Sequence, residues 1–185
     1  MSDTRDLGTL AVDGEAATIT FRRRLPHPIE AVWAAITSPD ERKAWFGETV
    51  IEPRVGGAIE MSPDEPPAAP EAKHMTGRIL AWQPPSRAPE DLPGARSAVF
   101  EHEWRQRIVE DGVVRYELTE DGDGTVLVFT HQGLSLRNAS GFIPGTHAFL
   151  DRLAAHLAGA ELPGWSGRYE ELAASYPTAG AGSLQ

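Results

Sequence analysis

The chain has 185 residues and contains no cysteine. Disulfide bonds, thiolate metal sites and cysteine nucleophiles are therefore excluded. The sequence also lacks any run of about 18 apolar residues, the length that a transmembrane helix requires. Its first residues are polar and lead into no apolar segment of the kind that a secretory signal peptide contains. A soluble cytoplasmic protein is therefore expected.

Basic residues are scarce: 17 Lys and Arg stand against 27 Asp and Glu, and the formal net charge at pH 7 is −10. Such a charge opposes binding to nucleic acids and to anionic membranes, so neither is expected as a partner. The densest basic cluster is Arg22, Arg23 and Arg24, within a predicted strand whose alternation places Arg23 on the opposite face from the other two. We expect a solvated strand edge here. An inward-facing Arg23 would instead need a carboxylate partner or an anionic ligand group.

Common catalytic and nucleotide-binding motifs are missing as well. The sequence has no Gly-x-Ser-x-Gly nucleophile elbow, no Gly-x-x-x-x-Gly-Lys phosphate loop and no Rossmann fingerprint. Gly56-Gly57 is interpreted as the start of a strand. The sequence thus identifies no catalytic residue, and neither a metal nor a cofactor is expected.

The size and composition are those of one globular domain. Apolar residues make up 41% of the chain and charged residues 24%, which is typical of a folded protein with a sizeable core. We expect a single domain over residues 1–185, with its core at about 7–176 and a flexible tail at 177–185.

A β-hairpin followed by two short helices is predicted for the first part of the chain. Residues 7–12 and 17–25 have strand character, and Asp13-Gly14 between them supplies the positive φ angles of a tight turn. An apolar stripe at helical spacing predicts an amphipathic helix over residues 29–36. The capping-box pattern of residues 38–41 predicts a second helix directly after it.

Antiparallel strands and a long final helix are predicted for the remainder. Phe100, His102 and Trp104 share one face of the strand at 97–108. Further strands are expected at 56–61, 73–82, 113–120 and 125–133, with Leu127, Phe129 and His131 on one face of the last. Loops are expected at 63–70, 84–93 and 138–144, and helices at 145–158 and 165–175.

The order of elements, with Val32-Trp33, Trp45-Phe46, Gly56-Gly57 and the strand-ending His131, resembles the SRPBCC superfamily, which is also called START-like or birch-pollen-allergen-like. Within it the chain looks most like the bacterial homologues of the activator of the heat-shock protein 90 ATPase. The ending supports this, because it is similar to that branch in the pattern Gly145-x-His147-x-x-Leu150-Asp151-x-Leu153-Ala154-x-His156-Leu157-x-Gly159, followed by Trp165. The resemblance extends over about residues 7–176.

The resemblance implies an α+β helix-grip fold: a curved antiparallel β-sheet wrapped around a long C-terminal helix, with two short helices after the first main strand. In such proteins the space between sheet and helix commonly holds a hydrophobic ligand. The alternative is a core that aromatic side chains fill completely. The residues expected to line a ligand pocket are Trp45, Phe46, Phe100, His102, Trp104, Phe129, His131, Phe142, His147 and Leu150.

Three of these residues are histidines that could converge inside the fold. His102 and His131 lie on predicted strands, and His147 flanks the apolar arc of the final helix. Their wide spacing matches no local metal motif, so hydrogen-bonding roles are favoured over metal ligation. Asp151, four residues after His147, could orient that imidazole, although an exposed i, i+4 pair is the commoner arrangement.

The leading hypothesis is a protein that binds a small hydrophobic or aromatic molecule without turning it over. The second hypothesis is an enzyme of the polyketide cyclase or aromatase type that uses pocket histidines. The third is a co-chaperone-like activator of a heat-shock protein ATPase, acting through its surface. The partners considered are therefore a small hydrophobic molecule, a chaperone ATPase and, in a homodimer, a second copy of the chain.

Overall fold

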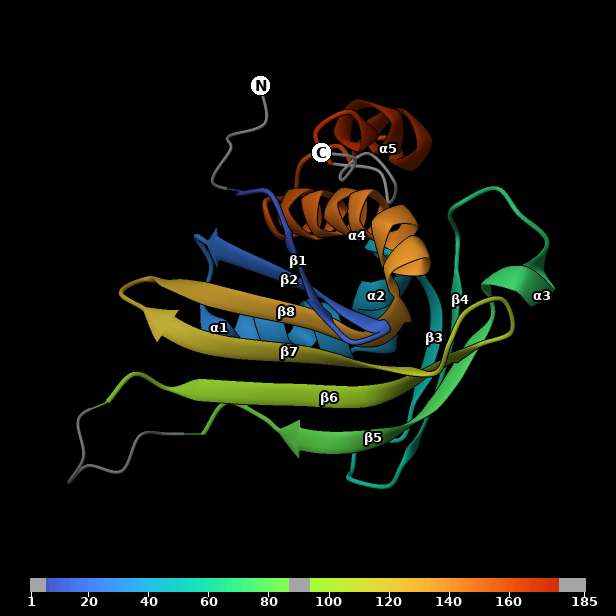
Figure 1. Cartoon of the computed structure of the whole chain (residues 1–185). Coiled ribbons are helices and arrows are strands. Elements are labelled where there is room, and N and C mark those ends of the chain that lie inside the picture. Colours follow the sequence, from blue (N-terminus) through green and yellow to red (C-terminus); the bar gives the residue numbers. More distant parts are fainter. Residues whose placement is uncertain (1–5, 87–93, 177–185) are drawn as a thin grey trace.

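The computed structural model describes residues 6–86 and 94–176 (Figure 1). The strands are β1 (Thr9–Asp13), β2 (Ala16–Leu25), β3 (Gly47–Ile51), β4 (Ala58–Pro63), β5 (Met75–Gln83), β6 (Ser97–Gln106), β7 (Gly112–Asp121) and β8 (Gly124–Ser135). The helices are α1 (Ile29–Thr37), α2 (Pro39–Trp45), α3 (Pro70–Lys73), α4 (Leu136–Leu157) and α5 (Trp165–Ala173).

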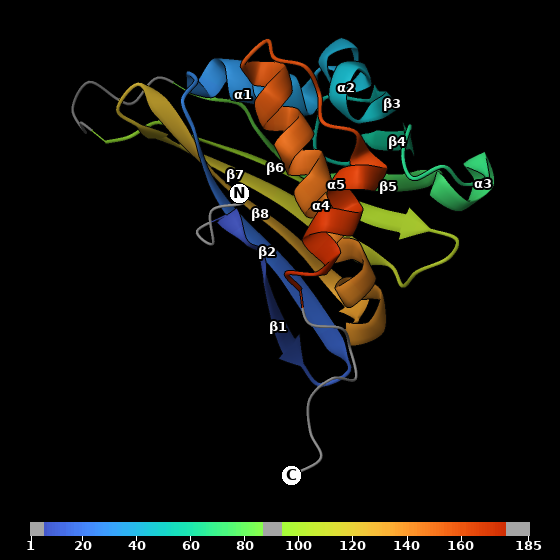
Figure 2. The same cartoon turned by 90° about the horizontal axis from the view of Figure 1, so that it is seen from above.

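All eight strands form one curved antiparallel sheet in the order β1-β2-β8-β7-β6-β5-β4-β3. The long helix α4 lies across the inner face, α1 and α2 cover the same face beside it, and α5 packs on the outer side of α4 (Figure 2). This arrangement confirms the predicted helix-grip fold. The two short helices follow β2, the first main strand, as expected.

Two tight turns follow directly from the sequence. Gly14 and Gly122 both have φ of 62°, a left-handed conformation that glycine adopts without a steric cost. The first joins β1 to β2 with Asp13 opposite Ala16, and the second joins β7 to β8. Both hairpins were predicted at these positions, whereas the edge strand β3 was not.

Helix α4 begins much earlier than predicted. The loop expected at residues 138–144 is helical, because α4 starts at Leu136 behind the N-cap Ser135, whose side chain accepts from the backbone N–H of Asn138. Pro144 lies inside the helix, where a proline removes one backbone hydrogen bond. Ala139 and Ile143 are both buried against the core. This burial outweighs the cost of the proline.

The predicted capping box at α2 is wrong in its contacts. Ser38 occupies the N-cap position, but its side chain forms no capping hydrogen bond. Glu41 does not turn back to Ser38: its Oε2 lies 2.5 Å from Nε2 of His156 on α4. The carboxylate thus links α2 to the long helix, and this tertiary contact replaces the local one.

Arg23 is not at a solvated edge, which corrects the expectation for the arginine cluster. Strand β2 lies between β1 and β8, and the Arg23 side chain points to the inner face, where the residue is only 7% exposed. Its guanidinium donates to the backbone carbonyl of Asp6 and lies 5.1 Å from the centre of the Phe21 ring. Arg22 and Arg24 point outward and are exposed, as alternation requires.

Candidate functional site

An apolar pocket of about 450 Å³ lies between the inner face of the sheet and α4. Residues of β6, β7 and β8 form its floor, α4 and the end of α2 form its walls, and the β4–β5 connection with α3 forms its rim. Helix α5 closes one side. The main lining side chains are Trp45, Phe46, Pro66, Lys73, Trp104, Gln106, Tyr116, Phe129, His131, Phe142, Thr146, Phe149, Leu150, Trp165 and Tyr169.

Strand alternation places the floor side chains. Tyr116 on β7 is directly opposite Phe129 on β8, and their rings make an edge contact with centroids 5.1 Å apart. Two residues further along β8, on the same face, His131 lies 5.1 Å from the ring of Trp104. The floor is therefore a continuous aromatic surface with one imidazole and one phenol in it.

Helical spacing places the wall on α4. Phe142, Thr146 and Phe149 follow one another at intervals of four and three residues and face the floor. Phe149 contacts Phe46, with ring centroids 4.8 Å apart. Phe46 also contacts the buried guanidinium of Arg42, which lies 4.5 Å from the centre of the Phe46 ring.

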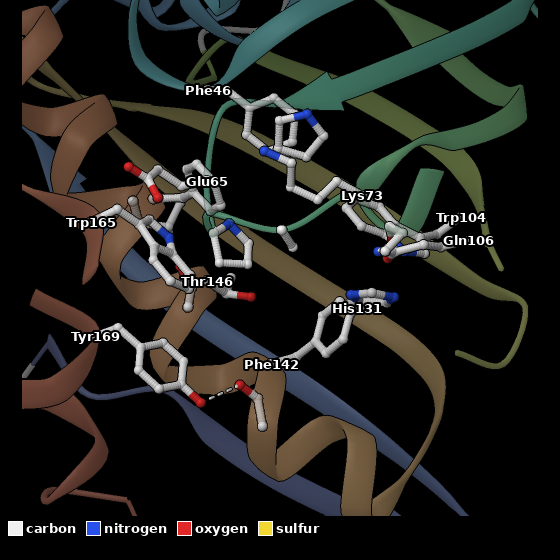
Figure 3. A pocket seen from close by; sticks show the side chains of 18 of the residues that line it. Phe46, Glu65, Lys73, Trp104, Gln106, His131, Phe142, Thr146, Trp165 and Tyr169 are labelled. Atoms are coloured by element: carbon white, nitrogen blue, oxygen red, sulfur yellow. Dashed lines mark hydrogen bonds between the residues drawn. The ribbon is translucent and has the colours of Figure 1, made fainter. Parts of the chain in front are cut away.

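The rim is tied to the sheet by Gln106. Its amide Nε2 donates to the carbonyl of Ala72 at 2.6 Å, and its Oε1 accepts from Nε1 of Trp104 at 3.1 Å (Figure 3). Lys73 Nζ donates to the carbonyl of Asp64 at 2.8 Å. These bonds fix the proline-rich connection that was predicted as a loop over residues 63–70. Glu65 and Lys73 are the charged residues among the described lining.

Trp165 and Tyr169 of α5 were missed as lining residues. Trp165 Nε1 donates to the carbonyl of Gly145 at 3.2 Å, and the Tyr169 hydroxyl donates to that of Gly141 at 3.1 Å (Figure 3). A Cβ atom at Gly145 would lie 2.9 Å from Trp165, so only glycine permits this close packing. Two glycines spaced four apart on α4 were the signal that could have pointed to a second helix lying there.

Of the residues that the sequence analysis proposed, the pocket is lined by Trp45, Phe46, Trp104, Phe129, His131, Phe142 and Leu150. Their part in ligand binding stays a prediction. Phe100, His102 and His147 do not line it, so the expectation that the three histidines converge is wrong. The physical reason for Phe100 and His102 on β6 differs from the reason for His147 on α4.

Phe100 and His102 lie on the predicted face of β6 but further from the pocket. Phe100 packs against Trp33 and Trp82, with ring centroids at 6.4 and 5.5 Å. His102 is fully buried, with its Nδ1 2.8 Å from the carbonyl oxygen of Glu103. Burial lowers the pKa of His102 to about 3. These side chains fill the core, which was the alternative left open.

His147 faces the opposite side of α4, toward Phe21 of β2. Its Nδ1 lies 2.8 Å from the hydroxyl oxygen of Tyr176, which also accepts from the backbone N–H of Gly8. Its Nε2 lies 3.5 Å from Asp151. The expected exposed pair is thus a partly buried one, since the side chain of His147 is 1% exposed and that of Asp151 is 24% exposed. Burial lowers its pKa to about 4.

His131 is the histidine that faces the pocket. It is 2% exposed, and its Nε2 has no hydrogen-bond partner among the described residues. Burial lowers the pKa of His131 to about 4, so its imidazole is neutral at physiological pH. A neutral imidazole offers one donor and one acceptor. The site can therefore offer a closely packed apolar surface and, at Nδ1 of His131, a hydrogen bond to a polar group of a ligand.

Neither a metal centre nor a membrane span emerges from residues 6–86 and 94–176. No cluster of three or more His, Asp or Glu side chains in these ranges is arranged to hold a metal ion. No helix in them is both long and apolar enough to cross a membrane.

Known proteins share this architecture. A crystal structure of CalU16 from Micromonospora echinospora superposes with a TM-score of 0.65 at 25% sequence identity, over 92% of each chain. The solution structure of the protein encoded by gene BPP1335 of Bordetella parapertussis gives 0.64 at 23% identity, over 100% of this chain and 98% of that one. Protein MLL2253 from Mesorhizobium loti gives 0.61 at 22% identity, over 78% of this chain and 99% of that one.

No curated protein matches the chain. A family model does: the one described as Activator of Hsp90 ATPase homolog 1-like protein matches residues 26–158, from the end of β2 to the end of α4. This match and the shared fold agree with the resemblance drawn from the sequence. The chain therefore belongs to the Activator of Hsp90 ATPase homolog 1-like family, within the SRPBCC superfamily.

Proposed function

We propose that the protein binds a small hydrophobic or aromatic molecule in the pocket between its sheet and α4. The observation that carries the proposal is a space of about 450 Å³ whose floor and walls are aromatic. Ligand sites in proteins are commonly concave and apolar, with volumes of roughly 300–1,000 Å³ and few polar groups. Apolar surface that is left accessible and unpacked in this way often marks a ligand-binding groove.

Binding without turnover is favoured over catalysis by the surroundings of His131. An acid–base role for the imidazole would be supported by a carboxylate beside it that orients the ring. Within the described part of the chain His131 contacts rings, Trp104 at 5.1 Å and Phe142 at 5.8 Å, and forms no ion pair. The chaperone-partner hypothesis concerns the surface of the protein, whereas the pocket supports a ligand.

The test is a fluorescence titration with N-phenyl-1-naphthylamine, an apolar dye, on three proteins. We expect saturable binding to the wild type. Thr146→Trp places an indole inside the pocket and should weaken binding at least tenfold. Arg137→Trp adds the same indole to an exposed position of α4 outside the lining and should leave binding unchanged. Dye binding that is absent, or equal in all three proteins, would refute the proposal.

A further inference from the structure

Two polar groups on the pocket floor lack partners within the described chain. The Tyr116 hydroxyl forms no hydrogen bond there, and it is not among the enclosed unpaired atoms, so it is open to the pocket. Nδ1 of His131 likewise forms no hydrogen bond within the described residues and is open to the pocket. The other ring nitrogen, Nε2, is enclosed. Of the other polar groups nearby, Gln106 and the indole N–H groups of Trp104 and Trp165 are already bonded, whereas the Thr146 hydroxyl on the α4 wall forms no hydrogen bond within the described residues.

The two open groups are neighbours on the floor. On adjacent strands, Tyr116 pairs with Phe129, and His131 follows Phe129 by two residues on the same face. Diagonal positions of this kind have Cβ atoms about 7 Å apart, within reach of one small molecule. Both rings are also held in place by aromatic contacts: Tyr116 stacks on Phe100 with 15° between the planes, and His131 meets Phe142 edge-on at 81°.

Charge is confined to the rim. Glu65 and Lys73 are the charged lining residues, and both belong to the β4–β5 connection and α3. A carboxylate on the floor would lose its hydration without gaining a cation, which is strongly unfavourable. Because burial lowers the pKa of His131 to about 4, the imidazole supplies no positive charge either. A hydroxyl or carbonyl group suits the floor better.

We infer that the ligand is a neutral, flat aromatic molecule carrying a hydroxyl or carbonyl group, and that His131 and Tyr116 select it by hydrogen bonds to that group. The inference rests on the proposed function, because it assumes that the pocket is the binding site. The aromatic floor and walls supply affinity for the ring system. The two polar residues decide which ring system is preferred and how it is oriented.

Calorimetric titration with naphthalene, 2-naphthol and 2-naphthoate tests the inference, because these three molecules share one ring system. We expect 2-naphthol to bind about tenfold more tightly than naphthalene, which is the factor that one hydrogen bond of about 1.4 kcal/mol provides. The anion 2-naphthoate should bind most weakly. His131→Phe and Tyr116→Phe should each reduce the preference for 2-naphthol while naphthalene binding is retained, which also shows that the variants fold.

His102→Phe is the matched control, since it removes a buried imidazole outside the pocket and should change neither affinity. Equal binding of naphthalene and 2-naphthol would overturn the inference but leave the proposed function intact. So would tightest binding of 2-naphthoate, and a loss of that binding in Lys73→Gln would place the selecting charge at the rim. Failure of all three molecules to bind would count against the proposed function itself.

Discussion

Mild acid should destabilise this protein through its buried histidines. His102, His131 and His147 are all at most 2% exposed, and burial lowers their pKa values to about 3, 4 and 4. In the unfolded chain a histidine has a pKa of about 6.5. Between these values the unfolded state binds protons that the folded state does not. Stability is therefore fully present above about pH 6.5 and is lost as the pH falls toward the native pKa values.

The size of the effect at pH 5 depends little on how far each native pKa is lowered. At that pH all three native imidazoles remain neutral, while the unfolded ones lie about 1.5 pH units below their pKa. Each histidine then costs about 2 kcal/mol, at 1.36 kcal/mol per unit. Three such residues give about 6 kcal/mol, a large part of the 5–15 kcal/mol that stabilises a typical domain.

Urea unfolding at pH 7 and at pH 5, followed by circular dichroism, measures this loss. His102→Phe and His131→Phe should each reduce the difference between the two pH values by about 2 kcal/mol, and the double variant by about 4 kcal/mol. Tyr116→Phe changes the same core but removes no imidazole, so the difference should stay at its wild-type value. If the single histidine variants also keep the wild-type difference, the buried imidazoles are not the source of the acid sensitivity.

Two further predictions concern the packing of α5 and the chain after it. Tyr176→Phe removes the hydroxyl that bonds to His147 and should lower the free energy of unfolding by about 2 kcal/mol in a urea titration, since a buried imidazole nitrogen loses its partner. A change below about 0.5 kcal/mol would contradict this. Gly145→Ala should destabilise by about 1–3 kcal/mol because its Cβ would press on Trp165. Gly141→Ala has no atom within 4 Å of the new Cβ and should instead stabilise by up to about 1 kcal/mol, which a melting comparison of the two variants can show.

Much of the fold could be predicted from local patterns. The Asp-Gly turn at residues 13–14 and the alternation in β6 and β8 depend on nearest neighbours, and the structure has them where the sequence indicates. The first nine residues of α4, 136–144, could not be predicted in this way. Pro144 argues locally for a loop, and only the burial of Ala139 and Ile143 against the sheet makes the helix favourable. Such burial depends on elements far away in the sequence.

The candidate site, like the fold, could be predicted only where local patterns determine it. Strand alternation correctly put His131 on the inner face, and the same reasoning put His102 there. Alternation does not say how far along the sheet the core is filled, so His102 was assigned to the pocket although aromatic rings enclose it. Helical spacing likewise placed His147 beside the apolar arc of α4. It does not determine which side of α4 faces the pocket and which side faces β2, where His147 lies. Trp165 and Tyr169 reach the pocket only through the docking of α5, which no local pattern encodes.

Acid and a bound ligand should both change the stability of the protein through His131, but over different pH ranges. A molecule bound only by the folded state adds about 2.7 kcal/mol of stability at a concentration of one hundred times its Kd, slightly more than one buried histidine costs at pH 5. His131 stays neutral in the folded protein until the pH approaches about 4, so its hydrogen bond to a hydroxyl or carbonyl is kept from pH 7 to pH 5. Affinity should thus be constant over the range in which the unfolded chain gains its protons. A ligand that fills the pocket would consequently offset part of the acid sensitivity that the buried imidazoles create.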